Sequence, residues 1–213
     1  MKRLKKFFLR SRRGPATPAL LRDTDFADGD IGSFAWDPPA ASDILSFAED
    51  GLTVWWDASW RDGREAAKVP AWLGAPTQLH LHSGHFAWNF VIEDMASAQI
   101  GVGVMLLWNV GPDWGFFGYL GSSPTAWSYD PSTGDVVNNT ESISSGLGRI
   151  EEGEVGVVSV ALELPRKREG SLRFAVGGVW SPAVSLPPSS VVRPAVSLLA
   201  PSQRVKLDRF HAT

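Results

Sequence analysis

The sequence predicts an all-β protein, a sandwich of two antiparallel sheets with a basic extension at its N-terminus. Short apolar stretches recur along the chain and are separated by turns rich in Gly, Pro and Asp. The apolar period of about 3.6 residues that marks an amphipathic helix is missing. The 213 residues include ten tryptophans and 21 glycines, as expected of aromatic sheet faces joined by tight turns. About ten to twelve short strands in a single domain are therefore expected.

Nine stretches are predicted strands: 34–36, 44–47, 52–56, 86–92, 99–108, 155–164, 171–176, 191–199 and 204–210. From Phe86 to Ile92 every second residue is apolar, which predicts a strand with one buried face. The run 99–108 is almost wholly apolar and contains Gly101 and Gly103, so burial of both its faces is predicted. Surface connections are expected at 61–68, 70–76 and 130–148. The tryptophans predicted to lie in the core are Trp36, Trp88 and Trp127.

The positive charge of the chain is concentrated at its beginning. The first 13 residues hold seven of the 20 Lys and Arg residues and no acidic residue. The rest of the chain is acidic, which argues against nucleic-acid binding by the folded domain. We predict a basic tail and linker at 1–22 and a β-sandwich domain at 23–213. The tail fits a transit segment, a membrane-surface anchor, or a docking tail that contacts an acidic surface or RNA; a solvated, disordered tail is the simplest alternative.

Composition also bears on membranes and on the cellular compartment. The longest apolar run, 100–108, is about half of what a bilayer requires, so no transmembrane segment is expected. The three apolar residues 7–9 are too few for a secretory signal. Cysteine is absent, which excludes disulfides, thiolate zinc sites and cysteine nucleophiles. The compartment stays open, with an intracellular location favoured.

Several short phrases occur in a defined order along residues 79–210. They are Gly84, Phe86 and Trp88; Ile100, Gly101 and Gly103; Leu120, Gly121, Trp127 and Tyr129; and the stretches 153–157, 170–174 and 193–198. This order resembles the SPRY family, whose central phrases are a Gly-aromatic-Trp strand, a Gly-x-Gly strand, and Leu-Gly followed by Ser-Trp-Gly-Tyr. Ala126 and Ser128 flank Trp127 here, which departs from the last phrase. The resemblance implies a concanavalin-like jelly-roll sandwich and a non-enzymatic role in binding a protein or peptide partner.

Loops at one end of the sandwich are the expected binding surface. Trp55 and Trp56 are consecutive, so one of them must face away from the core. Trp108 and Trp114 border a Gly/Pro/Asp loop, where rings either offer contact area at low entropy cost or fold back and become buried. Asp113 in this loop is expected to pair with a basic or amide group of the ligand. The predicted carriers of binding are Trp55, Trp56, Trp60, Trp108, Asp113, Trp114 and Tyr129.

Two other functions stay open. A carbohydrate-binding sandwich of the concanavalin-like kind would stack sugars on exposed tryptophans. Its hydrogen-bonding partners would come from Asp130, Asp135, Asn138 and Asn139. A structural subunit docked permanently in a large assembly would instead use the basic tail against an acidic or RNA surface. Exposure of the tryptophans separates these alternatives from a peptide-binding module.

Enzyme and metal chemistry have little support in the sequence. His80 and His82 would project from one face of a strand, close enough to share a metal with His85 as a third candidate. Their spacing overlaps the HxHxDH pattern of metallo-β-lactamase-like hydrolases, but Gly84 stands where the aspartate should be. The Gly-x-Ser-x-Gly and Gly-x-x-x-x-Gly-Lys patterns are absent. We expect a non-enzymatic protein without a cofactor, with these histidines exposed on a strand.

Overall fold

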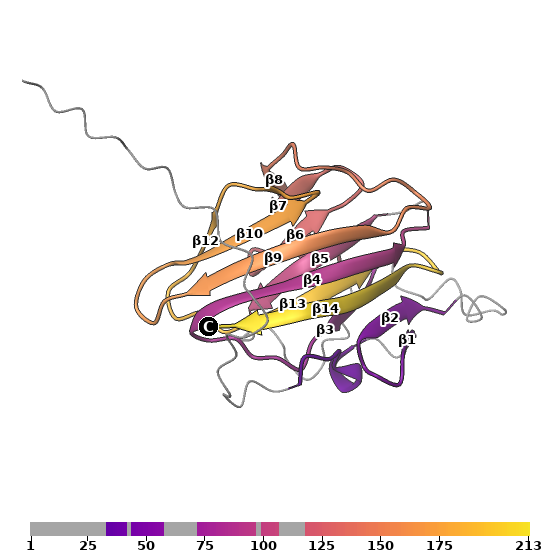
Figure 1. The fold of residues 1–213 in the computed structure, drawn as a ribbon, viewed down its shortest axis with the longest axis horizontal. Helices are drawn as coiled ribbons and strands as arrows, with labels where there is room; N and C mark the ends of the chain where they lie inside the picture. Colours follow the sequence, from indigo (N-terminus) through magenta and orange to yellow (C-terminus); the bar gives the residue numbers. More distant parts are fainter. Residues whose placement is uncertain (1–32, 42–43, 58–71, 97–98, 107–117) are drawn as a thin grey trace, which may run out of the picture.

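The computed structural model describes residues 33–41, 44–57, 72–96, 99–106 and 118–213. In these ranges the chain forms two antiparallel sheets that pack face to face (Figure 1). The eight-stranded sheet contains β1 (Leu45–Phe47), β2 (Thr53–Trp56), β14 (Arg204–Ala212), β4 (Gly84–Asp94), β9 (Gly156–Leu164), β10 (Gly170–Val176), β11 (Val179–Trp180) and β12 (Val184–Leu186). The six-stranded sheet contains β3 (Leu73–Pro76), β13 (Val192–Leu198), β5 (Ile100–Leu106), β6 (Ala126–Asp130), β7 (Asp135–Asn138) and β8 (Glu141–Ser144). The described residues also contain two short 3-10 helices, η1 (Pro38–Ala40) and η5 (Leu120–Ser122).

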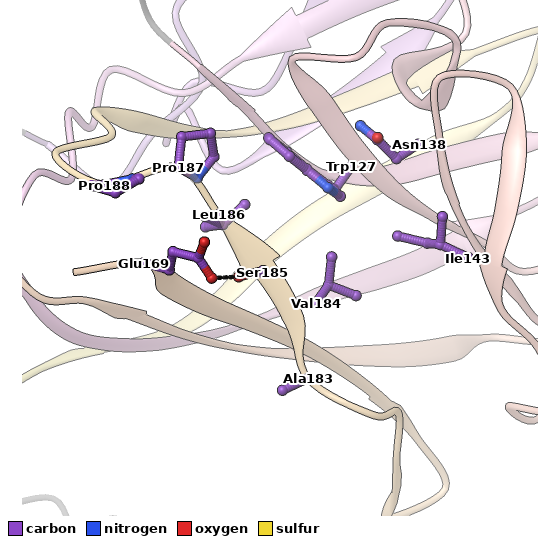
Figure 2. Close-up of a pocket in the computed structure, with 10 residues that line it drawn as sticks. All are labelled: Trp127, Asn138, Ile143, Glu169, Ala183, Val184, Ser185, Leu186, Pro187 and Pro188. Atoms are coloured by element: carbon purple, nitrogen blue, oxygen red, sulfur yellow. Dashed lines mark hydrogen bonds between the residues drawn. The ribbon is translucent and has the colours of Figure 1, made fainter.

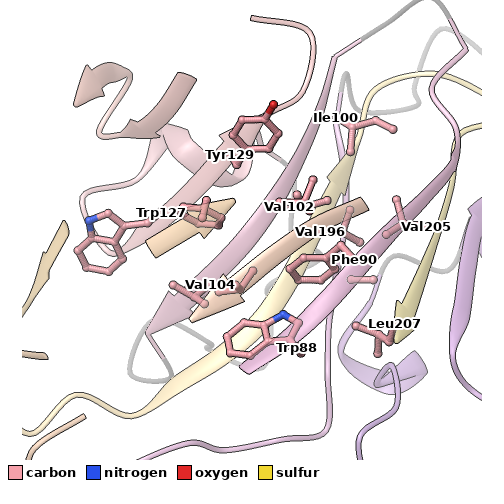
Figure 3. Packing of buried hydrophobic residues seen from close by; sticks show 14 of the residues in the cluster. Trp88, Phe90, Ile100, Val102, Val104, Trp127, Tyr129, Val196, Val205 and Leu207 are labelled. Carbon is pink, nitrogen blue, oxygen red and sulfur yellow. The ribbon is translucent and has the colours of Figure 1, made fainter. Parts of the chain in front are cut away.

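Strand β4 is central to the eight-stranded sheet and confirms the period-two prediction. It pairs with β14 on one side and β9 on the other, and its buried residues alternate from Phe86 to Ile92. Trp88 and Phe90 on this face are 1% and 0% exposed, and their rings meet edge to face at 6.2 Å. Figure 3 shows both rings pointing between the sheets, toward Val104 and Val196 of the facing sheet. The alternation therefore places one face of β4 in the core.

Strand β5 is buried on both faces, as its apolar run predicts. A Cβ added to Gly103 would lie 2.0 Å from the carbonyl oxygen of Trp127 on β6, so only glycine fits. On the outer face, the ring of Tyr119 packs against Gly101, and Leu120 is fully buried beside Met105. The segment around η5 thus covers the outer face of the sheet at β5.

Two predicted connections are strands instead. Residues 130–148, expected to be a surface excursion, contain β7 and β8, which extend the six-stranded sheet beyond β6. Residues 70–76 contain β3, whose four residues are buried against β13. Pro76 lacks an N–H donor, and its place on an edge strand makes that absence harmless. Both predictions were wrong because backbone pairing needs neither strong β propensity nor an apolar pattern.

The segment before β1 contributes a single isolated bridge rather than the strand predicted at 34–36. Trp36 pairs with Thr77, and its indole N–H donates to the carbonyl oxygen of Leu52 at 2.9 Å. The Trp36 side chain is 1% exposed, in agreement with its predicted place in the core. Trp127 is also buried, at 5% exposure. Within the described ranges, no helix has the length and hydropathy needed to span a bilayer.

Candidate functional site

An open groove lies at the end of the sandwich where β2 and β4 finish and β14 begins. The register sets this meeting point, because Arg204 at the start of β14 pairs with Trp55 on one side and Asp94 on the other. The groove has a volume of about 420 Å³. Its lining residues are Trp55, Trp56, Asp57, Glu93, Asp94, Ser202 and Arg204. We call this cavity the Trp55 groove and this part of the sandwich the Trp56 end.

The two consecutive tryptophans face opposite sides of β2, as predicted. Trp56 is 8% exposed and belongs to the core cluster, whereas Trp55 is only half-buried on the outer face. The guanidinium carbon of Arg204 lies 4.8 Å from the centroid of the Trp55 ring. This geometry is a cation–π contact, in which the negative face of the indole attracts a positive charge. The groove therefore has one aromatic wall that already receives a cation of its own chain.

Buried hydrogen bonds hold the base of the groove rigid. Gln203 is fully buried, and its Nε2 donates to the carbonyl oxygens of Met95 at 2.9 Å and Gln99 at 3.1 Å. Its Oε1 accepts from the N–H groups of Leu199 and Ala200. The backbone carbonyl of Gln203 accepts from the N–H of Trp56 at 3.1 Å. One side chain thus joins the β4–β5 and β13–β14 connections beneath the groove.

Among the described residues that line it, the Trp55 groove has more carboxylates than cations. Asp57, Glu93 and Asp94 carry the carboxylates, and Arg204 carries a guanidinium. One oxygen of Asp94 accepts from the N–H of Ala96 at 2.9 Å. Across the described ranges, the side-chain ion pairs are Arg193–Asp37 and Arg209–Asp208. Arg204 thus stacks on Trp55 and, among the described residues, forms no ion pair with Glu93 or Asp94.

A second groove opens between the edges of the two sheets (Figure 2). It has a volume of about 630 Å³ and lies between β6–β8 on one side and β12 on the other. Its lining residues are Trp127, Asn138, Ile143, Glu169 and residues 183–188. Ile143 is 43% exposed there, and Ser185 donates to a carboxylate oxygen of Glu169 at 2.6 Å. This groove is the open side of the interlayer core, where β7 and β8 extend past the facing sheet.

Of the seven predicted carriers of binding, the structure describes Trp55, Trp56 and Tyr129. Trp55 and Trp56 line the Trp55 groove, whereas Trp60, Trp108, Asp113 and Trp114 lie outside the described residues. Leu106, the last described residue before Trp108, pairs with Val192 at the start of β13. That position is opposite to the Trp56 end, because β13 runs from Val192 toward the connection that leads into β14.

Tyr129 is corrected from a predicted ligand anchor to a core residue. It is fully buried, and its ring stacks on Phe174 of the facing sheet with 6.3 Å between centroids. Its hydroxyl donates to the carbonyl oxygen of Gly148. Figure 3 shows the side chain lying in the interlayer core beside Val102. Tyr129 follows Trp127 by two residues on β6, so the alternation that buries one ring also buries the other.

The three clustered histidines are exposed and do not converge on a metal. Leu79 and Leu81 are buried and alternate with exposed His80 and His82. Within the part of the chain that the structure describes, no three His, Cys, Asp or Glu side chains are placed to hold a metal ion. Burial lowers the pKa of His80, and the guanidinium of Arg193 lowers it further, while Asp37 opposes both effects.

The polar residues proposed for sugar binding are largely engaged in local structure. Asp130 is buried, and its Oδ1 accepts from both the N–H and the hydroxyl of Ser132. The amide of Asn138 donates to the carbonyl oxygens of Ser123 and Ala126. Asn139 is exposed at the β7–β8 turn. These contacts stabilise turns and leave Asp130 unable to meet a ligand at the surface.

The chain is similar in architecture to solved structures of SPRY domains. The SPRY domain of human HERC1 superposes with a TM-score of 0.59 at 15% identity, covering 82% of this chain and 97% of the other. A further human SPRY domain gives 0.58 at 15% identity, with 78% and 94% coverage. The PSpry domain of TRIM65 gives 0.58 at 14% identity, with 82% and 89% coverage. No family model and no curated protein sequence matches the chain.

Proposed function

Because the chain has an SPRY-like fold, we propose that it is a non-enzymatic recognition module that binds a peptide segment of a partner protein in the Trp55 groove. The observation that carries the proposal is the position of Trp55. Its ring lies on the outer face of β2, half-buried, at the mouth of a groove of about 420 Å³. Aromatic rings at such positions are typical anchors of protein interfaces.

The rigid base of the groove supports a binding role. Gln203 fixes two connections with its side-chain hydrogen bonds, and Trp56 extends from the groove into the core. A ligand therefore meets walls that are already ordered, which reduces the entropy cost of association. Pre-organisation of this kind favours a binding site over a surface that must fold around its partner.

The charges of the groove indicate the chemistry of the ligand. Glu93 and Asp94 line the groove together with Trp55. Carboxylates accept hydrogen bonds from amide, ammonium and guanidinium donors. Among the described residues of the lining, Ser202 carries a hydroxyl and no histidine lies beside it to act as a general base. We propose a ligand with one basic or amide-rich residue next to an apolar one. Trp60, four residues beyond Trp56, is retained as a proposed contributor.

Peptide display on the full chain tests this function. Random peptides are selected on the wild-type protein and then compared on Trp55→Ala, Glu93→Gln and a matched control, Ile143→Ala, in the second groove. The loss of an aromatic anchor typically costs ~2 kcal/mol or more, so Trp55→Ala should weaken the selected peptides by roughly 30-fold. Glu93→Gln should weaken basic peptides by a factor that shrinks as salt is added. Ile143→Ala should leave their affinity unchanged.

A different pattern would contradict the proposal. Selected peptides that bind Trp55→Ala as well as the wild type, but fail on Ile143→Ala, would place recognition in the second groove. Binding on a glycan array without selection of any peptide would instead establish the lectin alternative. Circular dichroism of each variant confirms that loss of binding does not come from unfolding.

A further inference from the structure

The Trp55 groove has a complementary ligand within its own chain. Residues 2–13 contain seven Lys and Arg residues, no acidic residue, and the apolar stretch Phe7, Phe8 and Leu9. The groove offers an aromatic wall beside an excess of carboxylates. This complementarity concerns both charge and apolar contact, and it involves a segment that lies outside the described residues.

Further described carboxylates lie at the Trp56 end, beyond the groove itself. Gly156 at the start of β9 pairs with Ile92, two residues before Asp94 on β4. The exposed residues that precede β9 include Glu151, Glu152 and Glu154. Their carboxylates therefore gather at the same end as Glu93 and Asp94. A cluster of like charge attracts an oppositely charged segment over about one Debye length, roughly 8–10 Å in physiological salt.

The wall of the groove shows that it accepts a cation in contact with indole. Arg204 provides one guanidinium over Trp55, with 4.8 Å between its Cζ and the ring centroid. It leaves Glu93 without an ion-pair partner among the described residues. A second cationic side chain entering beside Arg204 would meet that carboxylate. The site thus has a free negative group next to an aromatic surface, in a cavity large enough for a side chain.

The tail joins the described chain near the end of β14 that lies opposite to the groove, because the Phe34 ring stacks on Phe210 with 4.9 Å between centroids. The described chain begins at Ser33, and the N–H of Trp36 donates to the carbonyl oxygen of Gly51 in the β1–β2 turn at 2.9 Å. Phe210 lies six residues beyond Arg204 on β14, so the tail starts roughly 20 Å from the groove. A flexible chain of 19 residues, the number between Arg13 and Ser33, would have a root-mean-square span of roughly 25 Å, enough to cover this distance. A tether of this kind gives an effective concentration on the order of 1 mM.

We propose that residues 2–13 occupy the Trp55 groove in cis and compete there with the partner peptide. This inference rests on the groove being the binding site proposed above. At an effective concentration near 1 mM, even a millimolar contact keeps the groove filled about half of the time. The tail then acts as an internal competitor, whose release by salt, modification or a stronger ligand exposes the site.

Paramagnetic relaxation in the full-length chain tests the contact directly. The sequence has no cysteine, so Ser11→Cys gives a single position for a nitroxide label. The reporter is the indole N–H signal of Trp55, assigned by comparison with Trp55→Phe, and the reference is that of Trp127 near the opposite end. We expect the label to reduce the Trp55 signal at least twofold at low salt and to leave the Trp127 signal unchanged. About 1 M salt, where the Debye length is roughly 3 Å, should restore the Trp55 signal.

Charge-matched variants identify the surface that the tail contacts. Glu93→Lys with Asp94→Lys should abolish the relaxation effect on Trp55. The control, Glu141→Lys with Glu163→Lys, makes the same change in net charge at exposed positions away from the groove and should retain the effect. Persistence of the effect in the groove variant, or its absence in the wild type, would overturn the proposal.

Mixing and competition experiments separate the remaining outcomes. In a mixed sample, one protein carries the spin label without ¹⁵N, and the other carries ¹⁵N without the spin label. The Trp55 signal of this sample should stay intact. A twofold loss would mean that the tail binds a second molecule, which would overturn binding in cis. In the full chain, Lys5→Glu with Lys6→Glu should raise the affinity of a groove-selected peptide about twofold, the gain expected when the tail fills the groove half of the time. If this double substitution leaves the peptide affinity unchanged, while Trp55→Ala still weakens the selected peptides, competition by the tail is overturned. The proposed function then still stands.

Discussion

Arg193 on β13 and Asp37 before η1 form an ion pair of 2.6 Å that fastens the N-terminal segment to the six-stranded sheet. The Arg193 side chain is 4% exposed and Asp37 is 24% exposed. Arg193 also donates to the carbonyl oxygen of Thr77, both from Nε at 2.7 Å and from Nη2. The guanidinium is therefore a buried charge whose partners come from two different segments of the chain.

A double-mutant cycle on this pair should show strong coupling. Asp37→Ala leaves a buried guanidinium without its counter-charge and should lower the free energy of unfolding by about 3 kcal/mol. In an Arg193→Met background the same substitution should cost under about 1 kcal/mol, because no buried charge is left unpaired. Urea denaturation of the four proteins gives the coupling energy. Equal costs of Asp37→Ala in the two backgrounds would contradict this account.

Trp88 should be among the most sensitive core positions. Its side chain is 1% exposed, and its indole N–H is buried without a hydrogen-bond partner among the described residues. Trp88→Ala should destabilise the fold by about 3–5 kcal/mol. Trp88→Phe keeps most of the apolar volume and removes the unpaired donor, so it should cost under about 2 kcal/mol. Trp55→Ala, at a half-buried position, serves as the control, with an expected cost of about 1 kcal/mol.

Gly103 should tolerate no side chain. A Cβ at this position would meet the carbonyl oxygen of Trp127 at 2.0 Å and the Cα of Ser128 at 2.8 Å. Both are backbone atoms of the paired strand, so relief requires β5 and β6 to separate. Gly103→Ala should cost at least about 3 kcal/mol or prevent folding. Gly118→Ala, whose nearest neighbour would be the Ser122 hydroxyl at 3.5 Å, should change stability by less than about 1 kcal/mol. Thermal denaturation distinguishes the two variants.

The two tyrosines of the chain should not titrate in the native state at their usual pH. Burial raises the pKa of Tyr119 and Tyr129, and the carboxylates of Asp130 and Asp135 contribute to the increase. The unfolded chain releases these protons near pH 10, whereas the folded chain retains them. The stabilisation is therefore complete below about pH 10 and is lost as the pH rises toward the folded pKa.

Absorbance at 295 nm measures this behaviour. Phenolate should appear together with the loss of the folded circular dichroism signal, and Tyr119→Phe should halve its amplitude. A phenolate step near pH 10 in protein that is still folded would show that one of the rings is accessible to solvent.

The apolar pattern alone was sufficient to locate the two central strands. Alternation from Phe86 to Ile92 specified β4 and its buried face, and the run containing Gly101 and Gly103 specified a strand covered on both sides. These signals are local, because they depend on side-chain direction along one strand. The order of short phrases then indicated the SPRY-like sandwich that the solved structures share.

The candidate site was only partly accessible from the sequence. The pair Trp55 and Trp56 required that one ring face outward, but the register with β14 decided that it is Trp55. Gln203 gave no signal, because its hydrogen bonds join connections that lie far apart along the chain. Tyr129 is a core residue rather than a ligand anchor, and its spacing of two residues from Trp127 on β6 is the signal that indicates this.

The sequence by itself determined the fold class, the central strands and the presence of aromatic residues beyond what a core needs. These properties follow from composition and from the alternation of apolar and polar residues along a strand. Each segment shows this alternation regardless of which strand it pairs with. Tertiary structure decided that 70–76 and 130–148 become strands, since an edge strand is defined by the partner it pairs with. It also decided which charges surround Trp55, because Asp94 and Arg204 meet only when β4 and β14 pair.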